Sequence, residues 1–234
     1  MKKIINGLLI ALILVAGFSC TKVDNLPGPN AGFKGRIIDK TTSANLLTET
    51  SGMQIKLEEL SYSATPDPQY IPSKQDGTFE DDKLFKGHYR VTPYGGAFWP
   101  VDGVELDING TTSHDFEVTP YLAIKNLTNS LSGTTLTLTF NMVAPIPDGL
   151  PQIIDVKPFV NDTQFVGSGA NINNYSDVNK ITLNSNYSDV VGKTYTLTIP
   201  SLKSGRTFYA RVGVRVNDSF KQYNYSDIIE VKVP

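Results

Sequence analysis

Apolar and polar residues alternate with a period of two over much of the chain. In residues 207–216 every even-numbered position is apolar, and in residues 135–142 leucine, phenylalanine and methionine alternate with threonine and asparagine. This pattern predicts β-strands with one buried and one wet face. No segment sustains an apolar repeat at helical spacing. We therefore expect an all-β fold.

The predicted strands fall into two regions, and each is long enough for one β-sandwich. Sheets with one apolar face stack through those faces, so we expect two β-sandwich domains, at residues 32–120 and 121–234. Asn109–Gly110 predicts a hairpin, because this pair tolerates the positive φ of a tight turn. Residues 63–74 contain three prolines, which predicts a loop or an edge strand.

Three motifs in the first region carry a resemblance to known domains. They are "GRIID" at 35–39, "DGTF" at 76–79 and "LFKGHYRV" at 84–91. With these motifs the region resembles transthyretin-like (prealbumin-like) and carboxypeptidase-regulatory-like domains, which implies a β-sandwich and no particular function. Gly77 and Gly87 are expected to supply turn geometry. Three further positions of the pattern are expected in the core: Leu84, Tyr89 and Val91.

The second region carries one such motif, "LKSGRTFYARV" at 202–212. It resembles a stretch of fibronectin type III domains, with Leu202 and Gly205 in place and Phe208 where that pattern has a tyrosine. The resemblance implies an immunoglobulin-like or fibronectin-III-like sandwich for residues 121–234.

The first twenty residues have the features of an export signal. Lys2 and Lys3 precede residues 7–18, which contain no polar side chain and are shorter than the ~20 residues that span a bilayer. Cys20, the only cysteine, follows directly after Ser19. The segment resembles a loose bacterial lipobox, in which the cysteine carries lipid and becomes the first residue of the mature chain.

Under this interpretation residues 1–19 are a signal peptide, and residues 20–31 are a lipidated tether rich in proline and glycine. The protein is then exported, anchored to the outer membrane through lipid on Cys20, and displayed at the cell surface. Plain secretion with cleavage nearby and an uncleaved anchor are the alternatives.

A lipobox, a transthyretin-like domain and a second sandwich together resemble a family of Bacteroidetes cell-surface lipoproteins of unknown function, associated with Sus-like glycan-uptake loci. The resemblance implies an accessory role beside an outer-membrane transporter complex. The formal net charge of −2 gives no reason to expect nucleic acid as a partner.

Neither catalysis nor a metal centre is predicted by any combination of residues. His88 and His114 have no second histidine at metal-ligand spacing, and the sequence contains no known catalytic motif. Glycoside hydrolysis needs two acids across a cleft, but adjacent strand residues point to opposite faces, which disfavours Glu58–Glu59 and Asp81–Asp82. We expect no enzyme activity, no catalytic residue, no metal and no cofactor.

Aromatic residues in "YGGAFWPVDG", at 94–103, are the first candidates for ligand binding. Tyr94, Phe98 and Trp99, the only tryptophan, lie among glycines and prolines that predict a loop. An aromatic ring can stack on the C–H face of a sugar. The alternative is that Trp99 plugs the end of a sandwich or the seam between the domains.

A second aromatic run, at residues 217–227, is predicted to be a hairpin loop. It contains Phe220, Tyr223 and Tyr225, and tyrosine-rich loops are good binding surfaces. Packing of the loop against itself is the alternative.

These observations favour a non-enzymatic cell-envelope lipoprotein that binds polysaccharide or oligosaccharide, or acts as a scaffold, within a nutrient-uptake system. A fimbrial subunit or adhesin, which would need an exchangeable or inserted strand, is the alternative from a different class, and a glycan hydrolase is a third.

Overall fold

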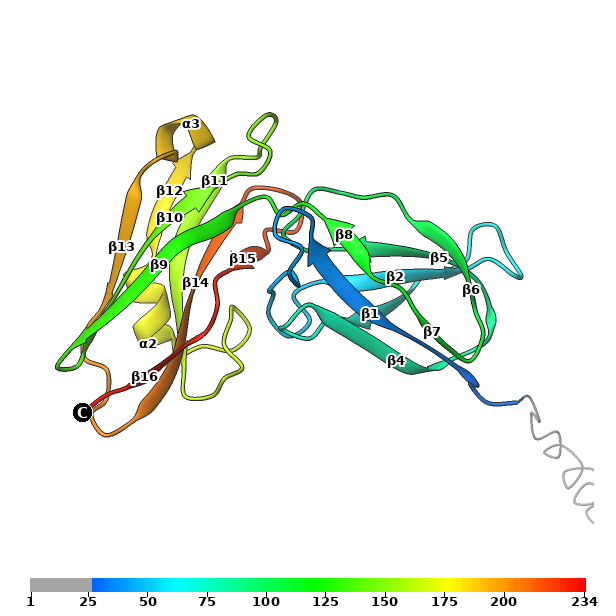
Figure 1. The fold of residues 1–234 in the computed structure, drawn as a ribbon, viewed down its shortest axis with the longest axis horizontal. Coiled ribbons are helices and arrows are strands. Elements are labelled where there is room, and N and C mark those ends of the chain that lie inside the picture. Colours follow the sequence, from blue (N-terminus) through cyan, green and yellow to red (C-terminus); the bar gives the residue numbers. More distant parts are fainter. Residues whose placement is uncertain (1–26) are drawn as a thin grey trace, which may run out of the picture.

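The computed structural model describes residues 27–234, which form two β-sandwiches placed end to end (Figure 1). The predicted signal peptide, Cys20 and the first residues of the predicted tether lie outside the described residues. Within residues 27–234, no helix is long and apolar enough to cross a bilayer.

The N-terminal domain stacks two four-stranded sheets. In the first, β1 lies between the antiparallel β4 and the parallel β7, and β8 continues the parallel pairing along β1. The second sheet is antiparallel, with the order β3-β2-β5-β6. The bounds are β1 Ala31–Asp39, β2 Gln54–Glu59, β3 Gln69–Pro72, β4 Thr78–Leu84, β5 Gly87–Tyr94, β6 Val104–Ile108, β7 Thr111–Ser113 and β8 Phe116–Val118.

The core between these two sheets contains the three residues that the motif at 84–91 predicted. The expected core positions Leu84, Tyr89 and Val91 are all buried. Three buried phenylalanine rings pack together, with centroids 5.4 to 6.5 Å apart: Phe33, Phe79 and Phe116.

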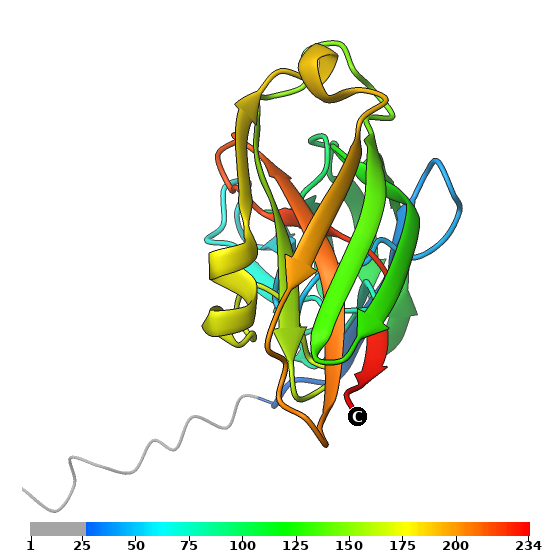
Figure 2. The ribbon, with the colours of Figure 1, turned by 90° about the vertical axis from the view of Figure 1, so that its left-hand side faces the viewer.

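The C-terminal domain packs a three-stranded sheet, β13-β10-β9, against a larger sheet, β12-β11-β14-β15, in which β16 also pairs with β14. Figure 2 shows this domain in front of the other. The predicted all-β fold of two sandwiches is confirmed. The strand bounds are β9 Ala123–Ser132, β10 Thr135–Val143, β11 Ile153–Asn161, β12 Ile181–Ser185, β13 Thr194–Ile199, β14 Thr207–Val216, β15 Tyr223–Tyr225 and β16 Ile229–Lys232.

Two single-turn α-helices interrupt the C-terminal domain, α2 at Asn173–Ser176 and α3 at Tyr187–Val190, with a 3₁₀ turn at Asp177–Asn179. Both α-helical turns fall where the sequence repeats asparagine-tyrosine-serine-aspartate.

The hairpin predicted at Asn109–Gly110 is wrong, although the turn is present and Gly110 has a φ of +63°. β6 pairs with β5, whereas β7 pairs with β1 in the other sheet. The turn therefore carries the chain across the sandwich. The Asn-Gly pair fixes where the chain turns. The unpaired edge of β1 then determines that β7 pairs with β1 and not with β6.

The predictions for Gly77, Gly87 and residues 63–74 have different outcomes. Gly77 has the expected positive φ, at +79°. Gly87 does not; a Cβ there would stand 2.7 Å from Oε1 of Glu59, so this glycine permits a close approach of side chains. Residues 63–74 contain the edge strand β3, as the prolines predicted.

Gly35 allows the β7–β8 connection to approach β1. His114 N–H donates to the carbonyl oxygen of Lys34 at 3.0 Å. A Cβ on Gly35 would stand 1.9 Å from the carbonyl oxygen of His114 and 2.8 Å from the ring of Phe79. Any larger residue must therefore push the β7–β8 connection away from the centre of the first sheet.

We expect Gly35→Ala to lower the free energy of unfolding by about 3 kcal/mol, because the added methyl overpacks a closed site. For a chain of this size the loss corresponds to a fall in Tm of about 6–12 °C, measurable by circular dichroism. Gly28→Ala is the control, since a Cβ there has no atom within 4 Å. Equal melting temperatures for the two variants would contradict the packing argument.

Candidate functional site

The sheet β3-β2-β5-β6 turns one face to the core and the other to solvent. Ile55 and Leu57 of β2 are buried, so the alternate residues Gln54, Lys56 and Glu58 point outward. Residues directly opposite each other in an antiparallel sheet share a face. The pairing therefore places further side chains on this surface, termed the outer face, and they include Tyr70, His88, Arg90, Thr92, Tyr94, Glu105 and Asp107.

Three exposed aromatic residues lie in contact at one end of the outer face. The ring centroids of Tyr70 and Tyr94 are 5.8 Å apart, and those of Tyr94 and Phe220 are 5.0 Å apart with the rings nearly perpendicular. The exposed fractions are 42, 39 and 40 % in that order. A contiguous exposed group of large rings is a feature that marks binding surfaces. These residues are termed the aromatic row.

Phe220 joins the row from the C-terminal domain, on the loop between β14 and β15. The backbone N–H of Lys221 donates to Asp218 at 2.6 Å, and that of Asn217 donates to the carbonyl oxygen of Gln152 at 2.8 Å. The ring of Phe220 lies over Gly95, 3.9 Å from where a Cβ would stand. Gly95, at a φ of +73°, turns the chain directly after Tyr94 and leaves room for this contact.

A hollow of about 160 Å³ adjoins the row, lined by Tyr94, Phe98, Tyr121 and Phe220 among others. Pockets that enclose a small ligand usually measure about 300–1,000 Å³. The site is therefore an open platform that a ligand would lie across.

The rest of the outer face carries paired charges. Lys56 and Glu58 are 2.9 Å apart, Arg90 and Glu105 are 2.8 Å apart, and Nδ1 of His88 lies 2.8 Å from Asp107. Surface ion pairs contribute little stability, but these pairs leave a surface rich in hydrogen-bond donors and acceptors with little net charge. Such a surface suits a polar, uncharged ligand.

Hydrogen bonds within these pairs shift the titration of their members. The hydrogen bond with Asp107 raises the pKa of His88 above its ordinary value of 6.5, with a smaller contribution from Glu105. The Arg90 guanidinium holds the pKa of Glu105 below its usual range.

Of the six aromatic residues singled out from the sequence, the structure brings Tyr94 and Phe220 together from different domains. Sequence reasoning missed Tyr70. The signal was available, because alternation around the buried Ile71 places Tyr70 on the opposite face of the predicted edge strand. Phe98 is 5 % exposed and packs in the N-terminal core.

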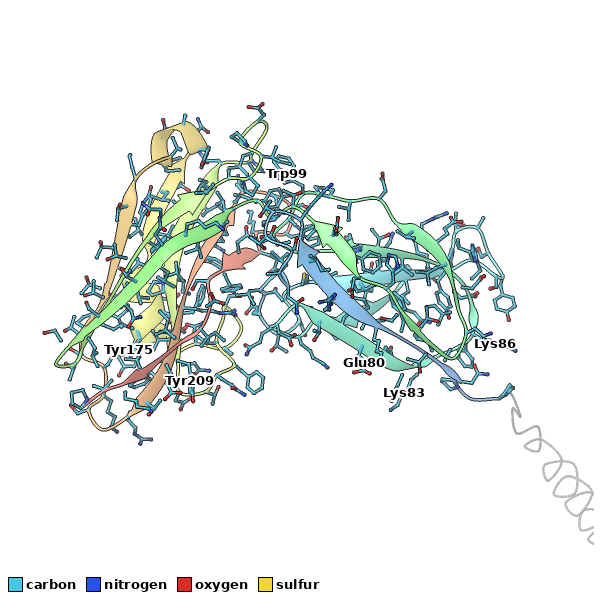
Figure 3. All side chains as sticks on the ribbon, in the orientation of Figure 1. Glu80, Lys83, Lys86, Trp99, Tyr175 and Tyr209 are labelled. Atoms are coloured by element: carbon cyan, nitrogen blue, oxygen red, sulfur yellow. The ribbon has the colours of Figure 1, made fainter. Side chains whose placement is uncertain are left out.

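Trp99 lies at the seam between the two domains (Figure 3). Its ring packs nearly edge-on against Tyr121, with centroids 5.2 Å apart, and it contacts the C-terminal core. The backbone N–H of Trp99 donates to the carbonyl oxygen of Thr119 at 2.9 Å. The ring is partly buried there and takes no part in the aromatic row.

Tyr223 and Tyr225 lie on strand β15, so the prediction that they belong to a hairpin loop is wrong. They are 6 and 8 % exposed, with ring centroids 4.9 and 5.4 Å from that of Phe159. Burial raises the pKa of both phenols. A ligand on the surface would meet Phe220 and not these two tyrosines.

The N-terminal domain covers this part of the C-terminal sheet, and it also buries an arginine of β14. Arg211 lies on the face of β14 that alternation predicts to be wet, yet it is only 1 % exposed. Its Nη1 donates to the carbonyl oxygen of Thr48 in the N-terminal domain at 2.7 Å, and its guanidinium lies 3.7 Å from the ring centre of Tyr225. Burial lowers the pKa of Arg211 to about 10, so the side chain is still a cation at neutral pH.

Two further contacts join the domains beside Arg211. The carboxylate of Glu49 accepts hydrogen bonds from the Ser168 hydroxyl and, at 2.7 Å, from the backbone N–H of Gly169. The amide of Asn224 donates to the carbonyl oxygen of Ala97 at 2.7 Å and accepts from the N–H of Leu122 at 3.0 Å. The bonds of Glu49 and the bond from Asn224 to Ala97 cross between the two sandwiches and so hold Phe220 beside Tyr94.

The acids considered from the sequence make local contacts. Oε1 of Glu59 accepts from the N–H of Ser61 at 3.0 Å, and Oδ1 of Asp81 accepts from the N–H of Lys83 at 2.8 Å. In the part of the chain that the structure describes, no group of three or more histidine, cysteine or acidic residues is placed to hold a metal ion.

Comparison with protein families finds matches over both domains. Residues 31–119 match a family described as "Protein of unknown function (DUF3823) N-terminal domain", and residues 122–230 match "Domain of unknown function (DUF3823_C)". No curated protein matches the chain.

Several solved structures share the fold and cover 88 % of this chain and all of their own. A DUF3823 family protein from Bacteroides uniformis is 24 % identical, with a TM-score of 0.79. One from Parabacteroides merdae is 28 % identical, with a TM-score of 0.68. A second B. uniformis protein, named "putative carbohydrate binding protein", is 22 % identical, with a TM-score of 0.76.

The position of Trp99 predicts a structural role. Trp99→Ala should lower the free energy of unfolding by about 2 kcal/mol, less than a fully buried tryptophan, and Tm by about 4–8 °C. Phe165→Ala, at an exposed ring, is the control and should melt as the parent protein does. An unchanged Tm for Trp99→Ala would place its ring outside the seam.

The raised pKa of His88 predicts a pH dependence. A histidine with a folded pKa above 6.5 stabilises the fold below that pH, and this contribution is lost as pH rises through the folded pKa. In an NMR titration the His88 ring should have a midpoint above 6.5, and Asp107→Asn should lower it. A midpoint that does not respond to Asp107→Asn would refute the assigned hydrogen bond.

Proposed function

Because the chain belongs to the DUF3823 family, whose function is not established, we propose a function from its own surface: it is a non-catalytic carbohydrate-binding protein of the cell envelope. The aromatic row carries this proposal. It presents three exposed rings in contact, contributed by both domains, beside a polar face with little net charge.

The chemistry of the outer face matches that of a sugar chain. A pyranose ring has an apolar C–H face that packs on an aromatic ring, and hydroxyl groups that donate and accept hydrogen bonds. Tyr94 offers such a ring, and Lys56 and Glu58 offer a donor and acceptors on the same face. Since the row continues to both sides of Tyr94, it suits an oligosaccharide or polysaccharide better than a single sugar.

One structural neighbour carries a name that agrees with this ligand class. A protein that shares this fold over both domains is named for carbohydrate binding. Its identity of 22 % supports the fold alone, so the assignment to this chain rests on the row.

We place the protein on the outer membrane, held by lipid on Cys20, as an accessory component of a glycan transporter complex. The lipobox-like sequence motivates this placement. The absence of catalysis is part of the proposal, and it is supported by the local contacts of Glu58, Glu59 and Asp81.

A fimbrial role fits the described residues less well. Assembly by strand exchange needs a sandwich that lacks one of its own strands. In residues 27–234, β8 closes the first sheet along β1, and β15 and β16 together complete the edge of the larger C-terminal sheet. We therefore prefer a soluble ligand over a donated strand.

We expect Tyr94→Ala and Phe220→Ala each to weaken glycan binding about tenfold, as when a central aromatic contact worth about 1.4 kcal/mol is removed. The measurement is retention on affinity gels with a panel of polysaccharides, followed by calorimetry on the best ligand. Both variants should keep the parent Tm, since these rings are exposed.

Matched controls exist for both changes. Tyr62 and Phe165 are exposed rings elsewhere, 91 and 55 % exposed, and Tyr62→Ala and Phe165→Ala should bind as the parent protein does. Equal affinity of all four variants on a retained glycan would refute the row as the site.

A further inference from the structure

A groove at the end of the N-terminal domain, away from the C-terminal domain, has no part in the proposed glycan site. Its volume is about 420 Å³. Residues from the start of the described chain, the β2–β3 loop and the β4–β5 turn line it, and they include Pro27, Asn30, Tyr62, Phe85 and Tyr89. It is termed the end groove.

Two aromatic side chains at the end groove are unusually exposed. Tyr62 is 91 % exposed and Phe85 is 53 % exposed. The turn that carries Phe85 is nonetheless well fixed, because the Tyr89 hydroxyl donates to the carbonyl oxygen of Phe85 at 2.8 Å, and the N–H of Asn30 donates to that of Leu84 at 3.0 Å. The fold therefore holds an apolar ring out in solvent.

Lysines flank the exposed ring. Lys83 and Lys86 are both exposed. Figure 3 shows Lys86 at this end of the domain and Lys83 below strand β4. Aromatic rings and lysines are the side chains that favour the boundary between lipid headgroups and acyl chains.

The number of residues between Cys20 and the groove limits how far this end of the protein can lie from the membrane. Pro27 is itself part of the groove wall, and only residues 21–26 separate it from Cys20. Seven residue steps span at most about 25 Å. A lipid on Cys20 therefore holds the end groove within about 25 Å of the bilayer.

We propose that the end groove is a membrane-contacting surface, with Tyr62 and Phe85 in the interfacial zone of the bilayer and Lys83 and Lys86 among the headgroups. This rests on the lipid anchor of the proposed function. Lipid chains anchor a protein more firmly when a second contact adds to them, and these rings supply one.

Such contact also sets the height of the glycan site. Glu59 lies at the groove and Tyr94 pairs with Gln54. Five residues along β2 at about 3.4 Å each place the aromatic row about 17 Å further from the membrane. The row then faces the medium with the C-terminal domain above it.

The test uses the full chain, purified from its own membrane and reconstituted into phosphatidylcholine vesicles with and without acyl-brominated lipid, which quenches tryptophan at short range. Tyr62→Trp and Phe85→Trp each add a reporter at the groove. Phe165→Trp is the matched control, and the native Trp99 at the seam gives the background. Mass spectrometry of the amino terminus establishes the state of Cys20.

We expect brominated lipid to remove much of the added emission of Tyr62→Trp and Phe85→Trp, and none of that of Phe165→Trp. Equal emission in both vesicle types, in protein shown to be acylated, would overturn the inference. An unmodified Cys20 would overturn it with its premise, and glycan retention by the same preparation would still test the aromatic row separately. Emission changes at the groove caused by added oligosaccharide, without bromine quenching, would assign the groove to sugar and overturn membrane contact.

Discussion

The burial of Arg211 between the domains is the contact on which the candidate site depends. A buried cation needs partners that compensate for lost hydration. Nη1 of Arg211 has the carbonyl oxygen of Thr48, and the guanidinium packs on the ring of Tyr225, whereas Nε and Nη2 have no hydrogen-bond partner in the described residues. With the hydrogen bonds of Glu49 and Asn224, this contact keeps two sandwiches in one arrangement. If the domains moved independently, Tyr94 and Phe220 would share no surface.

The same contact explains why some of the aromatic residues near it are buried and others are exposed. Tyr223 and Tyr225 stand three and five positions after Phe220, yet they are buried beneath the seam while Phe220 stays exposed. Trp99, the largest ring in the chain, packs at the seam. Aromatic residues therefore occur both at the domain interface and in the aromatic row beside it. The two groups differ in how far their rings are buried.

The molecule has its distinctive surfaces in two places along its length. The aromatic row spans the junction of the domains, and the end groove lies where the described chain begins. Each combines exposed rings with polar side chains, but the first adjoins a wide face of paired charges and the second adjoins the route to Cys20. This difference in surroundings leads us to assign a polar ligand to one and a lipid surface to the other.

The sequence by itself determined the all-β class, the two-domain plan and the buried faces of strands such as β10 and β13, because alternation of apolar residues is a local property that follows from the pleat of a strand. It also indicated Tyr94 and Phe220 as candidate rings, although Tyr94 is the last residue of strand β5 and does not lie in the predicted loop. Tertiary structure decided the rest. Partner choice at Asn109–Gly110 depended on a free edge of β1, and the predicted wet side of β14 was covered at Arg211 by another domain. Whether Tyr70, Tyr94 and Phe220 meet depends on how two separately folded sandwiches dock, which involves residues far apart in the chain and leaves no local pattern.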